Sequence, residues 1–406
     1  MTDINLVPVL LGGDLNSYNV ARAFHERYGV ITHVFGRYPI GPTKDSKIVS
    51  FHVVPKLDSD DIMVAEMRNF AEKNNGAALI LLGCTDDYAA MIIRNKSRLE
   101  DKYICPYIEE ALMDTLVSKA VFYEMCEKYN IPYPKTRVLG SDFDANELSE
   151  ENLGFKYPII VKPSSSIAYW KHPFEGMKKV YTAADKNEAA DIMRQIYGAG
   201  YPDKMILQDM IPGDDSNMYV LTAYSDRDND VKMMCLGHVL LEEHTPKGIG
   251  NHVAILTEYH EELMMTVRRF LESVGYTGFA NFDIKFDERD GKFKIFEINL
   301  RQGRSNFYVT HSGANIAKMF VGDATDSLGD DVLLIKEPSF WHTVPKKIIY
   351  SYIKDEETMK TVKALVKKGN TASSLFYSYD LRMNPMRLAY VLVHNRRYYK
   401  KYKLYP

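Results

Sequence analysis

Apolar and polar residues alternate on both sides of an Asp-Gly turn in the segment Asn281-Phe-Asp-Ile-Lys-Phe-Asp287, Glu-Arg-Asp-Gly291, Lys292-Phe-Lys-Ile-Phe-Glu-Ile-Asn299. This pattern predicts a β-hairpin. Residues two apart on a strand share a face, so Glu297 and Asn299 point the same way. If the hairpin is symmetric about Asp290, Asp283 lies opposite Glu297.

Three oxygen-bearing side chains then converge on one face of this hairpin: Asp283, Glu297 and Asn299. Carboxylate and amide oxygens suit a Mg²⁺ ion that also binds nucleotide phosphates. The alternative is the solvated polar face of a surface hairpin. Arg301, on the same face if the strand continues, favours the phosphate interpretation because a guanidinium binds oxyanions with two parallel hydrogen bonds.

Two lysines precede this hairpin in positions suited to a phosphate. Lys162 ends the apolar run Pro158–Val161 and leads into a loop of small residues, Ser164–Ser166. An ammonium at such a strand end can contact phosphates while the loop covers them. Lys119 begins a predicted helix and can reach the same anion. Each lysine alone is more often an exposed surface residue.

A further strand, from Met205, exits through Pro212 and Gly213 into acidic residues. Its end offers backbone N–H and C=O groups to a flat heterocycle, and the acid Asp215 suits ribose hydroxyls. The alternative is a plain connector between two sheets. A later polar segment containing His244, Lys247 and His252 is either a substrate loop or an ordinary loop.

The rest of the chain divides into three parts. Residues 1–114 alternate apolar strand runs (Leu6–Leu11, Val30–Phe35, Ala77–Leu82) with helical spacing, which predicts a parallel α/β sheet. Residues 115–325 are dominated by strands. The last part, 326–406, reads as mostly helical.

The composition is that of a globular protein of more than one domain, with 406 residues and 46% hydrophobic content. The net charge of −3 gives no indication of a nucleic-acid partner, and we expect none. The four cysteines are scattered, as expected of reduced core residues, and no apolar run reaches membrane-spanning length. We therefore expect a cytoplasmic protein.

The C-terminus is basic and rich in tyrosine, with seven Lys and Arg residues and no acid from Leu381 to Pro406. Such a segment attracts an anionic precursor or gives peripheral contact with a membrane surface. Alternatively, the tyrosines pack the last helix onto the body and the lysines are merely solvated.

Taken in order, these segments resemble the ATP-grasp superfamily over roughly residues 115–320. The resemblance implies an α/β N-terminal domain (1–114), an α+β ATP-grasp domain (115–325) and a small, mostly helical C-terminal region (326–406). The two ATP-grasp lobes, about 115–210 and 211–325, would sandwich ATP, with Ser164–Ser166 as part of a lid.

The resemblance also implies roles for individual residues. Lys119 and Lys162 would hold ATP phosphates, and Asp215 would bind ribose. The segment that contacts adenine would be Gln208, Asp209, Met210 and Ile211. Asp283, Glu297 and Asn299 would hold one or two Mg²⁺ ions, with Mn²⁺ as an alternative metal. Arg301 would steady the phosphates or the acyl-phosphate. Beyond the resemblance, we take Arg301, Arg304 and Lys162 as the candidate catalytic residues, and Arg301, Arg304 and Ser305 as the candidates that bind the carboxylates of the acid substrate. The alternative for Arg304 is an exposed loop charge.

Three stretches narrow the resemblance to the D-aspartate ligases of peptidoglycan cross-bridge synthesis: Ile211–Met218, Glu242–Pro246 and Glu297–Asn306. That family activates the β-carboxylate of D-aspartate and joins it to the lysine ε-amine of a UDP-linked muropeptide. One departure concerns D-alanine–D-alanine ligases, which carry an arginine where this chain has Asn281. Stabilising the tetrahedral intermediate would then fall to Arg301 or Arg304.

The expected function is therefore ATP-dependent carboxylate–amine ligation through an acyl-phosphate. Two alternatives stay open: an ATP-grasp carboxylase that uses carboxyphosphate, and a nucleotide-binding module without turnover. The expected partners are a small acid and an amine, the latter a UDP-linked peptidoglycan precursor. The sequence leaves open the amino acid and its stereochemistry, the acceptor, the role of the tail, and whether the chain forms a homodimer.

Overall fold

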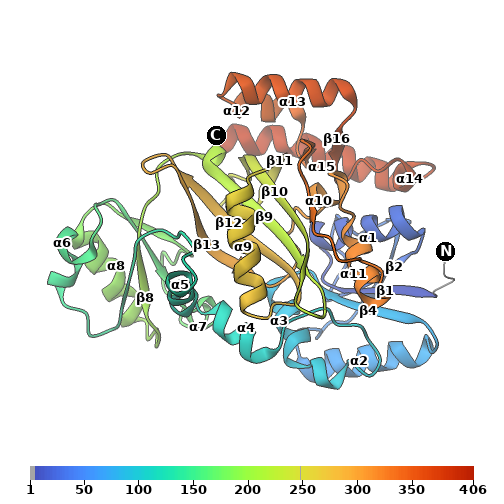
Figure 1. Cartoon of the computed structure of the whole chain (residues 1–406), viewed down its shortest axis with the longest axis horizontal. Coiled ribbons are helices and arrows are strands. Elements are labelled where there is room, and N and C mark those ends of the chain that lie inside the picture. Colours follow the sequence, from blue (N-terminus) through green and yellow to red (C-terminus); the bar gives the residue numbers. More distant parts are fainter. Residues whose placement is uncertain (1–4, 247) are drawn as a thin grey trace. The chain divides into compact units, whose positions relative to one another are not determined.

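The computed structural model describes residues 5–246 and 248–406 (Figure 1). Contacts divide the chain into two compact units. The larger unit comprises Met1–Glu110, Asp214–Phe282 and Asn299–Pro406, and the smaller unit comprises Ala111–Gly213 and Asp283–Ile298. Both units are discontinuous in sequence, so the contiguous boundaries drawn from the sequence stay a prediction.

The larger unit begins with a parallel sheet of order β3-β2-β1-β4. Its strands are β1 (Leu6–Leu11), β2 (Thr32–Gly36), β3 (Val49–Val53) and β4 (Ala78–Gly83). Helix α1 (Leu15–Tyr28) connects β1 to β2, α2 (Asp60–Lys73) connects β3 to β4, and α3 (Asp86–Arg94) follows β4. This confirms the predicted strand–helix alternation. Strand β3 was not predicted, because its sequence, with Ser50 and His52, lacks an apolar run. Helices α1 and α3 both start directly after a strand, so their N-termini lie at the carboxyl edge of the sheet.

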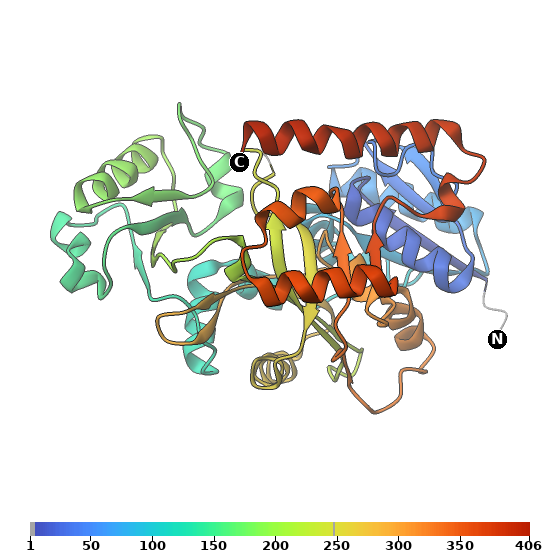
Figure 2. The same ribbon diagram turned by 90° about the horizontal axis from the view of Figure 1, so that it is seen from above.

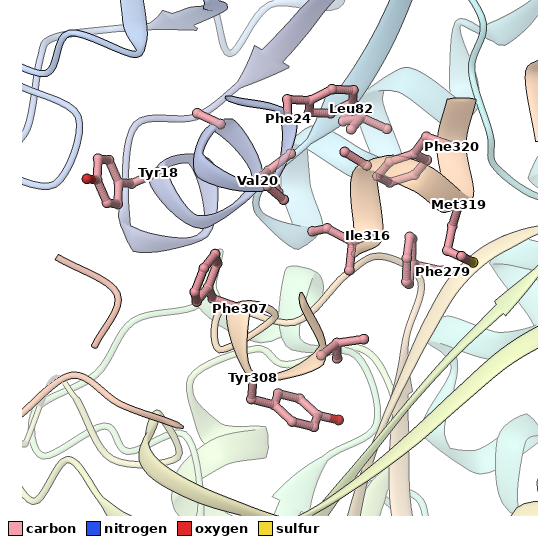
Figure 3. Close-up of a cluster of buried hydrophobic side chains, with 14 of the residues drawn as sticks. Tyr18, Val20, Phe24, Leu82, Phe279, Phe307, Tyr308, Ile316, Met319 and Phe320 are labelled. Carbon is pink, nitrogen blue, oxygen red and sulfur yellow. The ribbon is translucent and has the colours of Figure 1, made fainter. Parts of the chain in front are cut away.

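The core of this unit joins residues far apart in the sequence (Figure 3). Phe24 of α1 stacks on Phe320 of α11 (Ile316–Ala324), with ring centroids 6.3 Å apart and planes within 4°. Phe307 and Tyr308 of α10 (Phe307–His311) belong to the same buried cluster. The N-terminal sheet therefore shares its core with segments that follow the hairpin by sequence.

The large sheet has eight strands, in the order β13-β12-β9-β10-β11-β15-β16, and β14 pairs with β10. The hairpin predicted around Gly291 is confirmed as β12 (Gly278–Asp287) and β13 (Lys292–Asn299). The other strands are β9 (Met218–Ser225), β10 (Val231–Glu242), β11 (His252–Glu258), β14 (Leu333–Leu334), β15 (Phe340–His342) and β16 (Thr371–Ser373), and α9 (Glu261–Ser273) contacts β9 and β10.

The smaller unit is built on an antiparallel sheet of order β5-β8-β6-β7. Its strands are β5 (Thr136–Leu139), β6 (Ile159–Pro163), β7 (Tyr181–Ala183) and β8 (Met205–Asp209). Its helices include α4 (Glu110–Val117), whose first residue belongs to the larger unit, α5 (Lys119–Lys128), α6 (Glu150–Leu153), α7 (Ser166–Trp170) and α8 (Lys186–Gly198). Val161 and Leu207 are buried in a core with residues of α8. Since side chains alternate along a strand, Lys162 and Gln208 point to the opposite face of the sheet.

The C-terminal region of the larger unit contains α12 (Lys346–Tyr352), α13 (Glu356–Lys368), α14 (Ser378–Leu381) and α15 (Pro385–Leu404). Among the described residues, three short 3-10 helices also occur: Lys96–Arg98, Ala145–Leu148 and Asp215–Asn217. The four cysteines are buried and free, as expected. Within the described ranges, no helix is both long and apolar enough to cross a membrane.

A buried ion pair anchors α15. Arg387 Nε donates to Asp380 Oδ2 at 3.0 Å, and both side chains are fully buried. The same carboxylate oxygen accepts a hydrogen bond from Tyr18 of α1 at 2.8 Å. Arg387 Nη1 donates to the carbonyls of Gly41 and Lys44. The C-terminal helix thus satisfies polar groups of the N-terminal sheet region.

Candidate functional site: a lysine cluster and an arginine pair

The smaller unit brings the two predicted phosphate lysines close to Glu297. Lys119 begins α5, and its Nζ lies 2.9 Å from Glu297 Oε2 on β13. The Lys119 ammonium is the main cause that lowers the pKa of Glu297 to about 2, and Lys179 and Lys162 add to it against the opposing effect of burial. Glu297 is therefore ionised at neutral pH.

Lys162 is buried on β6, which is unusual for a lysine. Its Nζ donates to Gln208 Oε1 at 3.0 Å and to the hydroxyl of Tyr123 at 3.1 Å. Burial, and next the charge of Lys119, lowers the pKa of Lys162 to about 7, although Glu297 opposes the shift. Lys162 is thus close to half-protonated at neutral pH, and an approaching anion would favour its charged form.

A third lysine, Lys179, was missed by the sequence analysis. It precedes β7 and lies close enough to affect the pKa of both Glu297 and Lys162. The only local signal is the pair Lys178-Lys179, which looks like any solvated loop. Three ammonium groups around one carboxylate leave an excess of positive charge when all are protonated. Such an excess fits a polyphosphate.

The segment predicted to contact adenine ends β8. Gln208 links Lys162 to Thr136, since its Nε2 donates to Thr136 Oγ1 at 2.8 Å. Asp209 Oδ2 accepts from Arg289 Nη2 at 2.6 Å. Met210 follows β8 and is half-buried. The carbonyl of Ile211, which is buried, accepts a hydrogen bond from Lys285 Nζ at 3.0 Å. The backbone there is positioned by charged side chains of the hairpin.

The predicted metal ligands lie on the hairpin strands. Asp283 is on β12, and Glu297 and Asn299 are two apart on the neighbouring β13. Asn299 Nδ2 donates to the carbonyl of Asn281 at 3.2 Å, which fixes the amide. In the part of the chain that the structure describes, no three His, Cys, Asp or Glu side chains form a metal-binding group. The predicted set combines two carboxylates with one amide, and it stays a prediction.

The larger unit holds the two predicted substrate arginines opposite carboxylates of the N-terminal sheet. Arg301 Nε lies 2.8 Å from Oδ1 of Asp86, the first residue of α3. Arg304 Nε lies 3.9 Å from Oδ2 of Asp14, the N-cap residue of α1. Burial raises the pKa of Asp14, and Arg304 opposes that rise. Both arginines therefore lie at the carboxyl edge of a parallel sheet, where ligands of α/β proteins bind.

The loop that carries these arginines is fixed by α1. Asn16 Nδ2 donates to the carbonyl of Gln302 at 3.2 Å, and Asn306 Nδ2 donates to Asn16 Oδ1 at 2.7 Å. Asn19 Nδ2 donates to the carbonyl of Arg304 at 3.0 Å. Ser305 lies in the same loop and is buried. These asparagines were not predicted as site residues, because no local sequence pattern links residue 16 to residue 306.

Asp215, the predicted ribose ligand, belongs to the larger unit. Its Oδ2 accepts from the backbone N–H of Glu242 at 2.8 Å and lies 2.9 Å from His244 Nε2. His252 Nε2 lies 3.6 Å from Glu242 Oε1, and burial lowers the pKa of His252. Lys247, from the same predicted substrate loop, lies outside the described residues.

Solved structures share this fold at low sequence identity. The L-amino acid ligase of Bacillus licheniformis matches with a TM-score of 0.54 at 14% identity, covering 82% of this chain and 76% of that one. The biotin carboxylase domain dimer of the Hydrogenobacter thermophilus 2-oxoglutarate carboxylase, solved with MgADP, ADP and bicarbonate, matches with a TM-score of 0.59 at 14% identity, covering 80% and 71%. The fold is that of the ATP-grasp proteins.

No protein-family model matches the chain. A curated relative, the D-aspartate ligase of Enterococcus faecium, is 41% identical over 409 aligned residues, which cover 98% of this chain and 96% of the relative. The chain therefore belongs to the D-aspartate ligase family. It is an ATP-dependent ligase that forms C–N bonds, as the sequence analysis predicted.

Proposed function

We propose that this protein is a D-aspartate ligase that uses ATP to phosphorylate the β-carboxylate of D-aspartate and passes the acyl group to the lysine ε-amine of a UDP-linked muropeptide. The observation that carries the proposal is the cluster of Lys119, Lys162 and Lys179 around Glu297. Full-length similarity to a relative named for D-aspartate supports the choice of acid.

The lysine cluster meets the first requirement of the reaction. A carboxylate repels the γ-phosphate that it must attack, and cationic groups offset this repulsion while the acyl-phosphate and ADP form. Lys119 and Lys162 would contact the phosphates. Lys162 would gain charge as phosphate approaches, because burial keeps it near half-protonated beforehand.

The hairpin residues suit a magnesium ion, which ATP-grasp ligases in general use with ATP. Asp283, Glu297 and Asn299 would hold one or two Mg²⁺ ions, with Mn²⁺ as a substitute, and Glu297 is already deprotonated. When bound, such an ion neutralises phosphate charge. The segment Gln208–Ile211 would contact adenine, and Asp215 would bind ribose.

The arginine pair would bind the acid substrate. D-aspartate has two carboxylates and one ammonium, and the pair Arg301–Asp86 and Arg304–Asp14 offers groups of both signs. Arg301, Arg304 and Ser305 would take the carboxylates, while Asp14 or Asp86 would receive the ammonium. One arginine would also stabilise the tetrahedral intermediate when the amine adds and phosphate leaves.

The acyl-phosphate must be protected from water until the amine attacks. The Ser164–Ser166 segment is the proposed lid. The backbone N–H of Ser164 donates to the carbonyl of Lys204 at 3.0 Å, and Ser165 caps α7. The segment predicted as a loop of small residues therefore includes the start of helix α7.

The test is an ADP-release assay across D- and L-amino acids, with and without a UDP-muropeptide that ends in lysine. We expect release that requires D-aspartate and the acceptor together, and a product that is one aspartyl residue heavier by mass spectrometry. Release driven by bicarbonate would instead identify a carboxylase. Nucleotide binding without ADP release for any acid–amine pair would identify a non-catalytic module.

A further inference from the structure

Helix α15 has a buried face and an uncovered face. Arg387, Val391, Tyr398 and Tyr402 are its buried residues and recur at helical spacing. Tyr402 donates its hydroxyl to the carbonyl of Glu242, and Lys401 Nζ lies 2.6 Å from Glu243 Oε1. Figure 2 shows α15 (dark red) running along the outside of the larger unit. The tyrosines thus attach the helix, as one of the two sequence interpretations proposed.

The first half of the uncovered face is apolar. Met386, Leu392 and Val393 are 64%, 52% and 51% exposed, and Met383, just before the helix, is 91% exposed. Single exposed apolar residues are common, but these lie on or beside one helix face. Leu404, 61% exposed, extends the apolar surface to the last turn of α15.

The second half of the same face is basic. Arg396, Arg397, Lys400 and Lys403 are exposed, and within the described ranges no carboxylate forms an ion pair with them. Lys401, which does have a carboxylate partner, lies nearer the buried face. No acid occurs between residues 382 and 406, although the whole chain has a net charge of −3. The basic charge is therefore concentrated on one surface.

We propose that the uncovered face of α15 binds an anionic lipid surface, with the aliphatic side chains entering the headgroup region and the four basic side chains contacting lipid phosphates. Amphipathic helices with these two features bind membranes in the interface plane. A soluble anion would use the basic half but leave the aliphatic half exposed to water. A second copy of the chain would bring like charges together unless the helices were offset.

The test is co-sedimentation of the full-length protein with two kinds of vesicle. One kind contains phosphatidylcholine alone, and in the other about one lipid in three is the anionic phosphatidylglycerol. We expect binding only to the anionic vesicles, weakening with salt. The variant R396E/R397E/K400E/K403E should lose at least 100-fold in partitioning, since each basic residue near the surface contributes roughly fivefold. Leu392→Ser with Val393→Ser should lose about tenfold by removal of aliphatic burial.

The matched control reverses four exposed lysines on α13, as K360E/K363E/K367E/K368E, and should bind as the unaltered protein does. All variants should keep ADP release in the absence of vesicles, which shows that they fold. Equal loss in the control, or no vesicle binding by the unaltered protein, overturns the proposal. Two other results would also overturn it. One is a dimer, seen by sedimentation, that Leu392→Ser abolishes while the unaltered protein binds no vesicles. The other is release of the protein from vesicles by micromolar UDP-muropeptide.

Discussion

The lysine cluster of the smaller unit and the arginine pair of the larger unit balance charge in opposite ways. Lys119 forms an ion pair with Glu297, and the charges of Lys162 and Lys179 also lower the pKa of this one carboxylate. Arg301 and Arg304 each face a separate aspartate that follows a strand of the N-terminal sheet. The lysine cluster has more cationic than anionic side chains, whereas the arginine pair has one carboxylate for each guanidinium.

This difference supports the roles proposed for the two sites. A lysine can lose its charge when it is buried, as Lys162 partly does, and regain it when a polyanion arrives. An arginine stays charged, and its planar fork suits a carboxylate that replaces an existing partner. The unbalanced cluster thus suits triphosphate, and the balanced pair suits a small zwitterionic acid.

The largest effect is expected where the unbalanced cluster loses its carboxylate. Glu297→Ala should lower the rate of ATP turnover by about 100-fold or more, equivalent to roughly 2.7 kcal/mol in the barrier. ADP release and a thermal melt would be measured together. Glu151→Ala, an exposed acid in the same unit, is the control. A folded Glu297→Ala protein with normal turnover would remove Glu297 from the site.

Loss of the buried lysine should give the next largest effect. Lys162→Ala forfeits a charge-assisted contact of ~1.5–3 kcal/mol, so the KM for ATP should rise tenfold or more while the KM for the acid changes little. Lys156→Ala, at an exposed position of the same unit, serves as the control. A normal KM and kcat for Lys162→Ala would argue directly against the phosphate role.

The balanced pair should show the reverse selectivity. Arg304→Ala should raise the KM for the acid about tenfold by loss of one ionic hydrogen bond, and leave the KM for ATP within about twofold. Initial rates with each substrate varied in turn measure both constants. Arg269→Ala, an exposed arginine on α9, is the control. If Arg304→Ala changes only the KM for ATP, the two sites have been assigned the wrong way round.

The smallest effect concerns pH. The pKa of Lys162, about 7 in the absence of ligand, should rise when phosphate binds, so binding should take up a proton. Affinity for ATP should therefore fall as pH rises, by roughly fivefold between pH 7 and 8. Calorimetry in buffers of different ionisation enthalpy would measure the proton. Lys162→Arg should abolish the uptake, because arginine is charged throughout; persistent uptake would point to another group.

Sequence alone was sufficient for parts of the molecule with strong local patterns. The hairpin, with its alternation and Asp290-Gly291 turn, and the apolar strand before Lys162 were predicted from neighbours in the sequence and are confirmed. The smaller unit brings Lys119, Lys162 and Glu297 together, although their proposed roles await the tests above. The family assignment followed from the order of these motifs.

What sequence could not supply depends on contacts between distant segments. Asp14 and Asp86 can be assigned to the candidate site only from the folded structure, where they lie opposite Arg304 and Arg301, more than 200 residues away in the sequence. Lys179 lies in a loop with no periodicity. The larger unit is built from three separate segments of the chain, and α1 of the first segment packs on α11 of the third. No change in composition along the sequence indicates this arrangement.

The buried contact between Arg387 and the N-terminal region has a consequence for biosynthesis. The hydroxyl of Tyr18 hydrogen-bonds Asp380, 362 residues later, and the carbonyls of Gly41 and Lys44 depend on Arg387. A nascent chain on the ribosome therefore makes its first sheet long before it makes the groups that complete it. The N-terminal region therefore lacks these buried hydrogen-bond partners until translation is nearly finished.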